Sequence, residues 1–241
     1  MNEVVPLKIG IGLFTIVFIF GCFTLCAQLM WPKNSLYKRP CNTHPIIVID
    51  PGHGGNPGSV SKRGFKEKAI TLDIALRLEK LVKKNKLADV FLTRRKDVPL
   101  SLVDRRAYAN KKKCDVFISI HANASHNTAT NQVEVYYSSD WSHLLAKTIS
   151  QNLSSSFQIK HRIEDVDWTV LWDNWAPQGA VLVETMYLTN EDGERILGNQ
   201  KGREQIAQSL FKSLESVVSQ VKKQPASLNS AQDISMDKSA H

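Results

Sequence analysis

The stretch Ile46–Gly55, IIVIDPGHGG, decides the fold and points to a site. Four apolar, mostly β-branched residues in a row are typical of a buried strand, and the Pro-Gly pair cannot continue a hydrogen-bond ladder. Glycine on both sides of His53 allows the backbone to turn sharply and to approach whatever the imidazole holds. Because open α/β sheets place their ligands at strand ends, we hypothesise that His53 is a metal ligand.

The rest of the chain alternates strand-like and helix-like segments. Apolar runs predict further strands at 89–93, 116–120, 133–137 and 180–183. Helical spacing predicts helices over 70–84, 102–113, 144–153 and 206–221. Ser101 with Asp104 resembles a capping box, Asn190 is expected to cap a short helix, and 161–177 is expected to be a loop. This alternation predicts a single α/β domain over 46–221, with a mostly parallel, mixed sheet flanked by helices.

The N-terminal region has a different composition. Residues 9–30 carry no charged side chain, and their length is close to the ~20 residues that a membrane-spanning helix needs. Two interpretations remain open: an uncleaved signal anchor, or an export signal removed near Cys22 or Ala27. We expect export with retention at a membrane. Residues 1–30 are then the signal anchor or export signal, 31–45 a linker, and the polar stretch 222–241 a disordered tail.

Charge and cysteines leave several options open. The net charge of +8 fits nucleic acid, a membrane surface or an anionic cell wall equally well. Cys41 and Cys114 each precede a predicted strand. If these strands are neighbours in an exported domain, a disulfide between the two is sterically reasonable, and two free thiols are the alternative.

Three apolar strands are each followed by a residue that can bind metal: His53, His121 and Glu184. Because the carboxyl ends of parallel strands share one edge of a sheet, these side chains are expected to converge. Glu67 is a fourth candidate, at the start of a helix that returns to the same edge. Two histidines and a carboxylate are a ligand set of catalytic zinc, and a further carboxylate is needed as general base. The other histidines of the predicted domain lack this placement and are expected at the surface: His126, His143 and His161.

Four ordered motifs carry a resemblance to a known family. They are DPGHGG (50–55), GFKEK (64–68), SIHAN (119–123) and LVET (182–185). They resemble the successive motifs of zinc-dependent N-acetylmuramoyl-L-alanine amidases, which cleave the bacterial cell wall. Similarity to that family extends to LTR (92–94) with Asp97, to Arg105–Asn110 and to VEVYY (133–137).

The resemblance implies roles for the four candidates. One zinc ion per chain would be held by His53, Glu67 and His121, and Glu184 would be the catalytic carboxylate. The implied reaction is hydrolysis of the amide between N-acetylmuramic acid and L-alanine in peptidoglycan, during cell-wall remodelling or lysis. The expected location is the bacterial cell envelope, either membrane-anchored or periplasmic to extracellular. Peptidoglycan is the expected substrate. The membrane is expected to be a partner through residues 1–30, and nucleic acid is not expected to bind. The sequence does not identify an activating protein.

One departure and two alternatives remain. The family usually continues with Gly-Phe after its Glu-Thr pair, whereas Met186 and Tyr187 stand here, and the bulkier residue is expected to reshape the cleft floor. A zinc peptidase or deacylase on the same scaffold would share the ligands and differ in its products. A non-catalytic wall-binding regulator would be expected to have lost a ligand or the base, whereas all four positions hold competent residues.

Overall fold

A computed structural model describes residues 44–223 of the 241-residue chain. The predicted signal segment, nearly all of the linker, Cys41 and residues 224–241 lie outside this part. The signal segment and the Cys41–Cys114 disulfide therefore stay predictions. None of the helices within 44–223 combines the length and hydropathy needed to cross a membrane.

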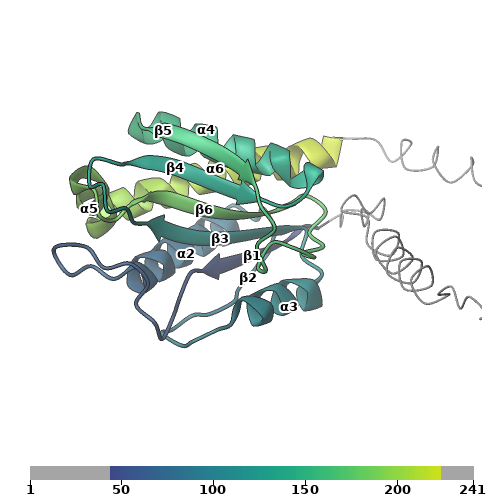
Figure 1. Cartoon of the computed structure of the whole chain (residues 1–241). Coiled ribbons are helices and arrows are strands. Elements are labelled where there is room, and N and C mark those ends of the chain that lie inside the picture. Colours follow the sequence, from purple (N-terminus) through teal and green to yellow (C-terminus); the bar gives the residue numbers. More distant parts are fainter. Residues whose placement is uncertain (1–43, 224–241) are drawn as a thin grey trace, which may run out of the picture. The chain divides into compact units, whose positions relative to one another are not determined.

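Six strands form one mixed sheet in the order β2-β1-β3-β6-β4-β5 (Figure 1). Neighbouring strands are parallel from β2 to β6, β4 runs antiparallel to β6, and β5 is parallel to β4. The strands are β1 (Ile46–Pro51), β2 (Asp89–Leu92), β3 (Val116–Asn123), β4 (Gln132–Tyr137), β5 (Lys160–Asp165) and β6 (Gly179–Tyr187). The predicted α/β class with a mostly parallel, mixed sheet is confirmed.

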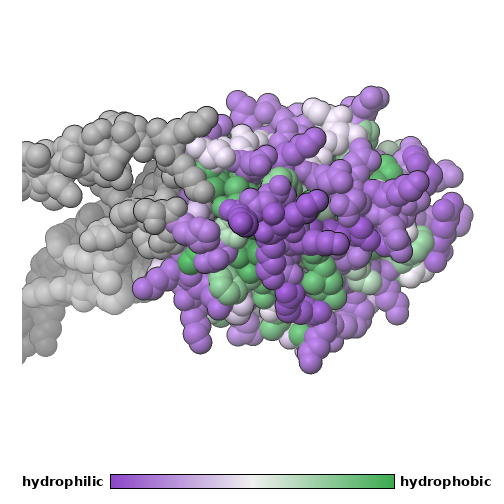
Figure 2. Space-filling view, turned by 180° about the vertical axis from the view of Figure 1, so that it is seen from behind, coloured by the Kyte–Doolittle hydropathy of each residue, from purple (hydrophilic) through white to green (hydrophobic). Residues whose placement is uncertain are grey.

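Helices cover one face of the sheet more completely than the other. In Figure 1, α2, α4 and α6 lie behind the sheet, while α3 lies in front of it. Seen from behind, hydrophilic residues cover most of the surface (Figure 2). The helices are α2 (Glu67–Lys84), α3 (Leu102–Lys112), α4 (His143–Phe157), α5 (Glu191–Gly198) and α6 (Gln200–Lys223), with a 3-10 turn at Asp140–Ser142.

Two helix starts confirm the predicted caps. Ser101 Oγ accepts a hydrogen bond from the Asp104 backbone N–H at 3.1 Å, and it donates one to the Asp104 carboxylate at 2.7 Å. Asn190 Oδ1 accepts from the backbone N–H groups of Asp192 and Gly193. Both caps satisfy donors that the first helical turn leaves without partners.

Alternate residues of the strands enter two separate cores. Ile47 and Ile49 belong to a large core against α2, α4 and α6, whereas Val48 belongs to a smaller core with Ala109 of α3 and Leu171. Since side chains alternate across a strand, His121 of β3 and Glu184 and Leu182 of β6 share the face of the smaller core, and so do Glu134 and Tyr136 of β4. The candidate site therefore lies on the face that carries α3 and the segment 166–178.

Two expectations are wrong in detail. The predicted loop 161–177 begins with strand β5, which pairs with β4 along Lys160–Asp165. This edge strand is polar and mostly exposed, so it carries no apolar alternation that the sequence could show. Met186 does not form a cleft floor, because it is fully buried in the large core on the opposite face.

Candidate metal centre

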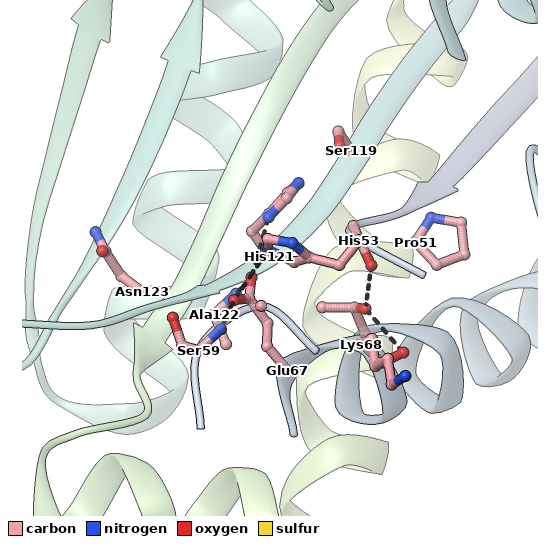
Figure 3. A network of polar contacts seen from close by, with 12 residues as sticks. Pro51, His53, Ser59, Glu67, Lys68, Ser119, His121, Ala122 and Asn123 are labelled. Atoms are coloured by element: carbon pink, nitrogen blue, oxygen red, sulfur yellow. Dashed lines mark hydrogen bonds and ion pairs between the residues drawn. The ribbon is translucent and has the colours of Figure 1, made fainter. Parts of the chain in front are cut away.

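Three predicted ligands meet at one edge of the sheet. One donor atom each from His53, Glu67 and His121 lies within 4.8 Å of the others. Glu67 Oε2 lies 3.0 Å from His53 Nε2, and Glu67 Oε1 lies 3.0 Å from His121 Nδ1 (Figure 3). The two imidazole rings meet edge to face with centroids 5.0 Å apart.

Backbone groups fix the carboxylate of Glu67 between the two histidines. Its Oε2 accepts from the Ser59 N–H at 2.8 Å, and its Oε1 accepts from the Ala122 N–H at 3.0 Å. Burial alone would raise the pKa of Glu67, but hydrogen bonds to His121 and His53 outweigh it and hold the pKa well below its ordinary range. The carboxylate is therefore ionised and preorganised toward a cation.

The loop that presents His53 has an unusual backbone. His53 has φ +59°, in the left-handed region that non-glycine residues seldom adopt, and Gly54 and Gly55 follow with φ +106° and +70°. Two buried arginines hold the loop by its carbonyl groups. Arg105 donates to the His53 carbonyl at 2.5 Å, and Arg94 donates to the Gly52 carbonyl at 2.6 Å. This costly local conformation is the kind found at functional sites.

Asp50 anchors the same loop from inside the sheet. Its side chain is fully buried and accepts hydrogen bonds from Arg105 at 2.7 Å, from Ser119 at 2.7 Å, and from Thr93. The sequence contained a signal for this residue, because a carboxylate directly after an apolar strand needs partners when buried. The pattern of strand ends points to the ligands and not to the groups beneath them, so it does not single out Asp50.

Two glycines leave space for the cluster. A Cβ added to Gly52 would lie 2.4 Å from the His121 ring, and one added to Gly58 would lie 2.6 Å from both Glu67 Oε2 and His53 Cδ2. Two imidazoles and an ionised carboxylate at short mutual distances are the donor set that zinc takes in catalytic sites. The residues present therefore fit a zinc ion.

Glu184 lies beside this cluster. It pairs with His121 in the parallel register of β3 and β6, so the two side chains are neighbours on one face. Its Oε2 is buried without a hydrogen-bond partner among residues 44–223. Burial, and then the negative charges of Glu67 and Glu134, raise the pKa of Glu184 well above its ordinary value. The structure thus brings all four predicted residues to one place.

Glu134 is a further residue of the site that the sequence did not single out. It faces Glu184 in the antiparallel register of β4 and β6 and is 2% exposed. Burial would raise the pKa of Glu134, but hydrogen bonds from tyrosine hydroxyls outweigh it and lower the pKa. Its donors are Asn123, Gln132, Tyr136, Arg162 and Tyr187. The sequence signal for Glu134 is the alternation in VEVYY, which places this acid on the same strand face as Tyr136.

The three remaining histidines of the domain behave as predicted. His126, His143 and His161 are all exposed and do not join the metal-binding group. His161 shares a hydrogen bond of 2.7 Å with Ser150 Oγ on α4. The position of a histidine after a buried strand therefore distinguishes the candidate ligands from the histidines at the surface.

The fold and the cluster together define an α/β domain with a group of side chains that could hold a metal ion, of the type that zinc hydrolases use. Residues 47–216 match the N-acetylmuramoyl-L-alanine amidase family over most of the described part of the chain. The chain belongs to this family, and the resemblance seen in its motifs is confirmed.

Relatives and solved structures agree with this assignment. The catalytic domain of CwlV, an N-acetylmuramoyl-L-alanine amidase from Bacillus (Paenibacillus) polymyxa var. colistinus, is 31% identical with a TM-score of 0.69, covering 73% of this chain and 98% of that one. The CwlD amidase from Clostridioides difficile, solved in complex with the GerS lipoprotein, is 28% identical with a TM-score of 0.67, covering 73% of this chain and 99% of that one. The amidase AmiC of Neisseria meningitidis is 28% identical; the match covers 71% of this chain but only 52% of AmiC.

Proposed function

We propose that this protein is a zinc-dependent N-acetylmuramoyl-L-alanine amidase that hydrolyses the amide between N-acetylmuramic acid and L-alanine in peptidoglycan. His53, Glu67 and His121 would hold one zinc ion, and Glu184 would be the catalytic carboxylate. The observation that carries this proposal is the three-donor cluster, whose atoms lie within 4.8 Å of one another, beside the buried carboxyl of Glu184.

Each protein group has a task in the proposed reaction. When bound, zinc would polarise the scissile carbonyl and make water acidic enough to lose a proton near neutral pH. Glu184 Oε2 takes that proton as the water oxygen bonds to the carbonyl carbon. The same oxygen then passes the proton to the alanine nitrogen as the carbon–nitrogen bond breaks. The products are a lactyl carboxylate on the glycan and a peptide with a free N-terminal amine.

The surroundings of Glu184 support this role. Its Oε2 is buried and has no hydrogen-bond partner among the described side chains and backbone groups, so no protein group competes with water or substrate for this oxygen. In the metal-free protein, burial raises the pKa of Glu184, and a raised pKa makes a carboxylate a stronger base, as a group that takes and returns a proton requires.

We infer a location in the bacterial cell envelope, because the proposed substrate lies outside the cytoplasmic membrane. Export through residues 1–30, with membrane attachment through that segment, fits this location and remains a prediction. Peptidoglycan is the proposed partner and nucleic acid is not. CwlD has been solved with a lipoprotein, which makes a protein partner worth testing for this chain too.

Digestion of purified peptidoglycan tests the function. The amidase proposal expects peptides that begin with L-alanine and glycan chains that carry free lactyl groups. Cuts within the stem peptide would instead identify a peptidase, and loss of acetyl groups a deacylase. Metal analysis that finds no zinc at near-stoichiometric level would favour a wall-binding regulator.

A further inference from the structure

Three exposed tryptophans lie on the segment 166–178, which connects β5 to β6. Trp168, Trp172 and Trp175 are 41%, 42% and 64% exposed, although indole rings are usually buried for most of their area. Val170 and Leu171 of the same segment are almost fully buried in the smaller core. The segment is thus firmly packed on its inner side while it presents aromatic rings on its outer side.

Helix α3 holds this segment in place. Arg106 donates to the Trp172 carbonyl at 3.1 Å, and its guanidinium lies 5.8 Å from the centre of the Trp172 ring. One turn further along α3, Asn110 donates to the Asp173 carbonyl at 2.9 Å and accepts from the Trp175 N–H at 3.1 Å. These contacts fix the backbone from which the indole rings project, so binding there would need little ordering of the chain.

The aromatic segment and the candidate metal centre share one face of the sheet. The ring of Trp168 packs on Tyr136 with centroids 4.3 Å apart, and the Tyr136 hydroxyl donates to Glu134 at 2.7 Å. Glu134 in turn faces Glu184 across β4 and β6. A series of neighbouring residues therefore leads from Trp168 to the strand position of Glu184, while Trp172 and Trp175 lie further along the same segment.

The charge around the rings narrows the type of ligand. Residues 164–178 contain four acidic side chains and no lysine or arginine: Glu164, Asp165, Asp167 and Asp173. Two arginines lie close to these acids: Arg106 of α3 contacts the Trp172 ring, and Arg162 pairs with Glu164. The four acids still outnumber the two arginines, and this negative balance disfavours an anionic lipid surface or an anionic wall polymer. A neutral ligand with flat apolar faces and polar edges suits indole rings that stand beside carboxylates and amides. Sugars of an N-acetylated glycan have this character, because their ring faces expose C–H groups while hydroxyl and acetamide groups line their edges.

We propose that Trp168, Trp172 and Trp175 form a glycan-binding surface that holds N-acetylhexosamine units on the same face of the sheet as the candidate metal centre. This inference rests on the proposed function, since it places the glycan strand of the substrate on the same face as the amide to be cleaved. It adds a contact with sugars remote from the scissile bond, and such contacts supply binding energy that positions the reacting group.

Equilibrium binding of a neutral glycan to the full-length protein tests the surface. The probe is chitopentaose, an uncharged chain of five N-acetylglucosamine units, and ligand-observed NMR measures its dissociation constant. Trp175→Ala is expected to weaken binding about threefold to tenfold, Trp172→Ala similarly, and Trp175→Phe to retain most of the affinity. Leu144→Ala is the matched control, because Leu144 is 48% exposed on α4, and it is expected to leave the affinity unchanged. Circular dichroism and the thermal midpoint check that each variant is folded.

The outcomes separate this inference from the proposed amidase activity. Chitopentaose binding does not depend on hydrolysis, so tryptophan-dependent binding would support the surface even in a protein that cleaves nothing. A protein that releases L-alanine peptides but binds chitopentaose equally well with and without Trp172 and Trp175 would overturn the inference and leave the amidase proposal standing. Loss of binding to vesicles or to a protein partner in these variants, with chitopentaose binding unchanged, would likewise overturn it.

Discussion

Glu184 on β6 faces Glu134 on β4 across the antiparallel register, and the two carboxyls have opposite surroundings. Glu134 accepts hydrogen bonds from five side chains, while Glu184 Oε2 has no partner within residues 44–223. The pKa of Glu134 is accordingly lowered and that of Glu184 raised. When the surroundings of two neighbouring acids separate their pKa values, the acid with the lower pKa often stays ionised while the other carries the proton.

The raised pKa of Glu184 predicts how the metal-free protein responds to pH. Between the ordinary value of 4.5 and its raised pKa, the folded state holds a proton that the unfolded state has released. Stability contributed by this group is therefore present at low pH and is lost as pH rises. Glu184→Gln is expected to raise the thermal midpoint in the presence of a chelator, with a gap over wild type that widens from about pH 5 to pH 8.

The matched variant is Glu134→Gln, for which the expected change in the thermal midpoint has the opposite sign. Its pKa is depressed, so its stabilising contribution is present above the ordinary value of 4.5 and is lost as pH falls. Glu134→Gln should lower the midpoint at neutral pH, and the deficit should shrink in acid. If both variants moved the midpoint in the same direction at pH 8, the contrast between the two carboxyls would be incorrect.

Crowding at Gly58 offers a way to weaken the metal site without removing a ligand. A Cβ at this position would lie 2.6 Å from Glu67 Oε2 and from His53 Cδ2. We expect Gly58→Ala to reduce zinc affinity about tenfold to a hundredfold, the range typical of changes to the groups that orient metal ligands. Competition with a chromogenic chelator measures this affinity.

Gly64→Ala is the control for Gly58→Ala. Gly64 also has a left-handed backbone, φ +85° against +69° for Gly58, but an added Cβ there meets nothing within 4 Å. Both variants carry a similar backbone penalty, and only Gly58→Ala should lose zinc affinity. Equal losses in the two variants would show that backbone strain, and not crowding of Glu67 and His53, determines the effect.

Much of the fold and the four candidate residues could be predicted from the sequence. The apolar strands that lead to His53 and into Glu184 are visible because burial leaves an apolar, β-branched run beside a polar residue. Strand β5 was not predictable in this way, since Lys160–Asp165 is held by backbone pairing at an exposed edge and buries little apolar surface. The partners of Asp50 and Glu134 come from other strands and helices, so only the folded chain reveals them.

The buried pair of Arg105 and Asp50 predicts a large effect on stability. The two side chains are 4% and 0% exposed and lie 2.7 Å apart. Arg105→Ala removes the buried ion-pair partner of Asp50 and leaves its carboxylate with hydrogen bonds from Thr93 and Ser119. The free energy of unfolding should fall by about 3–5 kcal/mol. Urea denaturation of the metal-free protein measures the change.

The surface pair of Arg195 and Asp192 provides the comparison for Arg105→Ala. Both side chains are largely exposed, and they lie 2.8 Å apart. Exposed ion pairs contribute about 0–1 kcal/mol, so Arg195→Ala should change the unfolding free energy by no more than that. An Arg105→Ala effect of the same small size would mean that the anchor beneath His53 contributes little.

The central claim is that His53, Glu67 and His121 hold zinc while Glu184 carries the proton. The most direct test measures zinc content and the mass of products from purified peptidoglycan for wild type, Glu184→Ala and His53→Ala. We predict one zinc per chain and L-alanine peptides for wild type, retained zinc with turnover lowered by about 10²–10⁴-fold for Glu184→Ala, and loss of both for His53→Ala. Glu184→Ala protein that cleaves at the wild-type rate, or His53→Ala protein that keeps its zinc, would contradict the account.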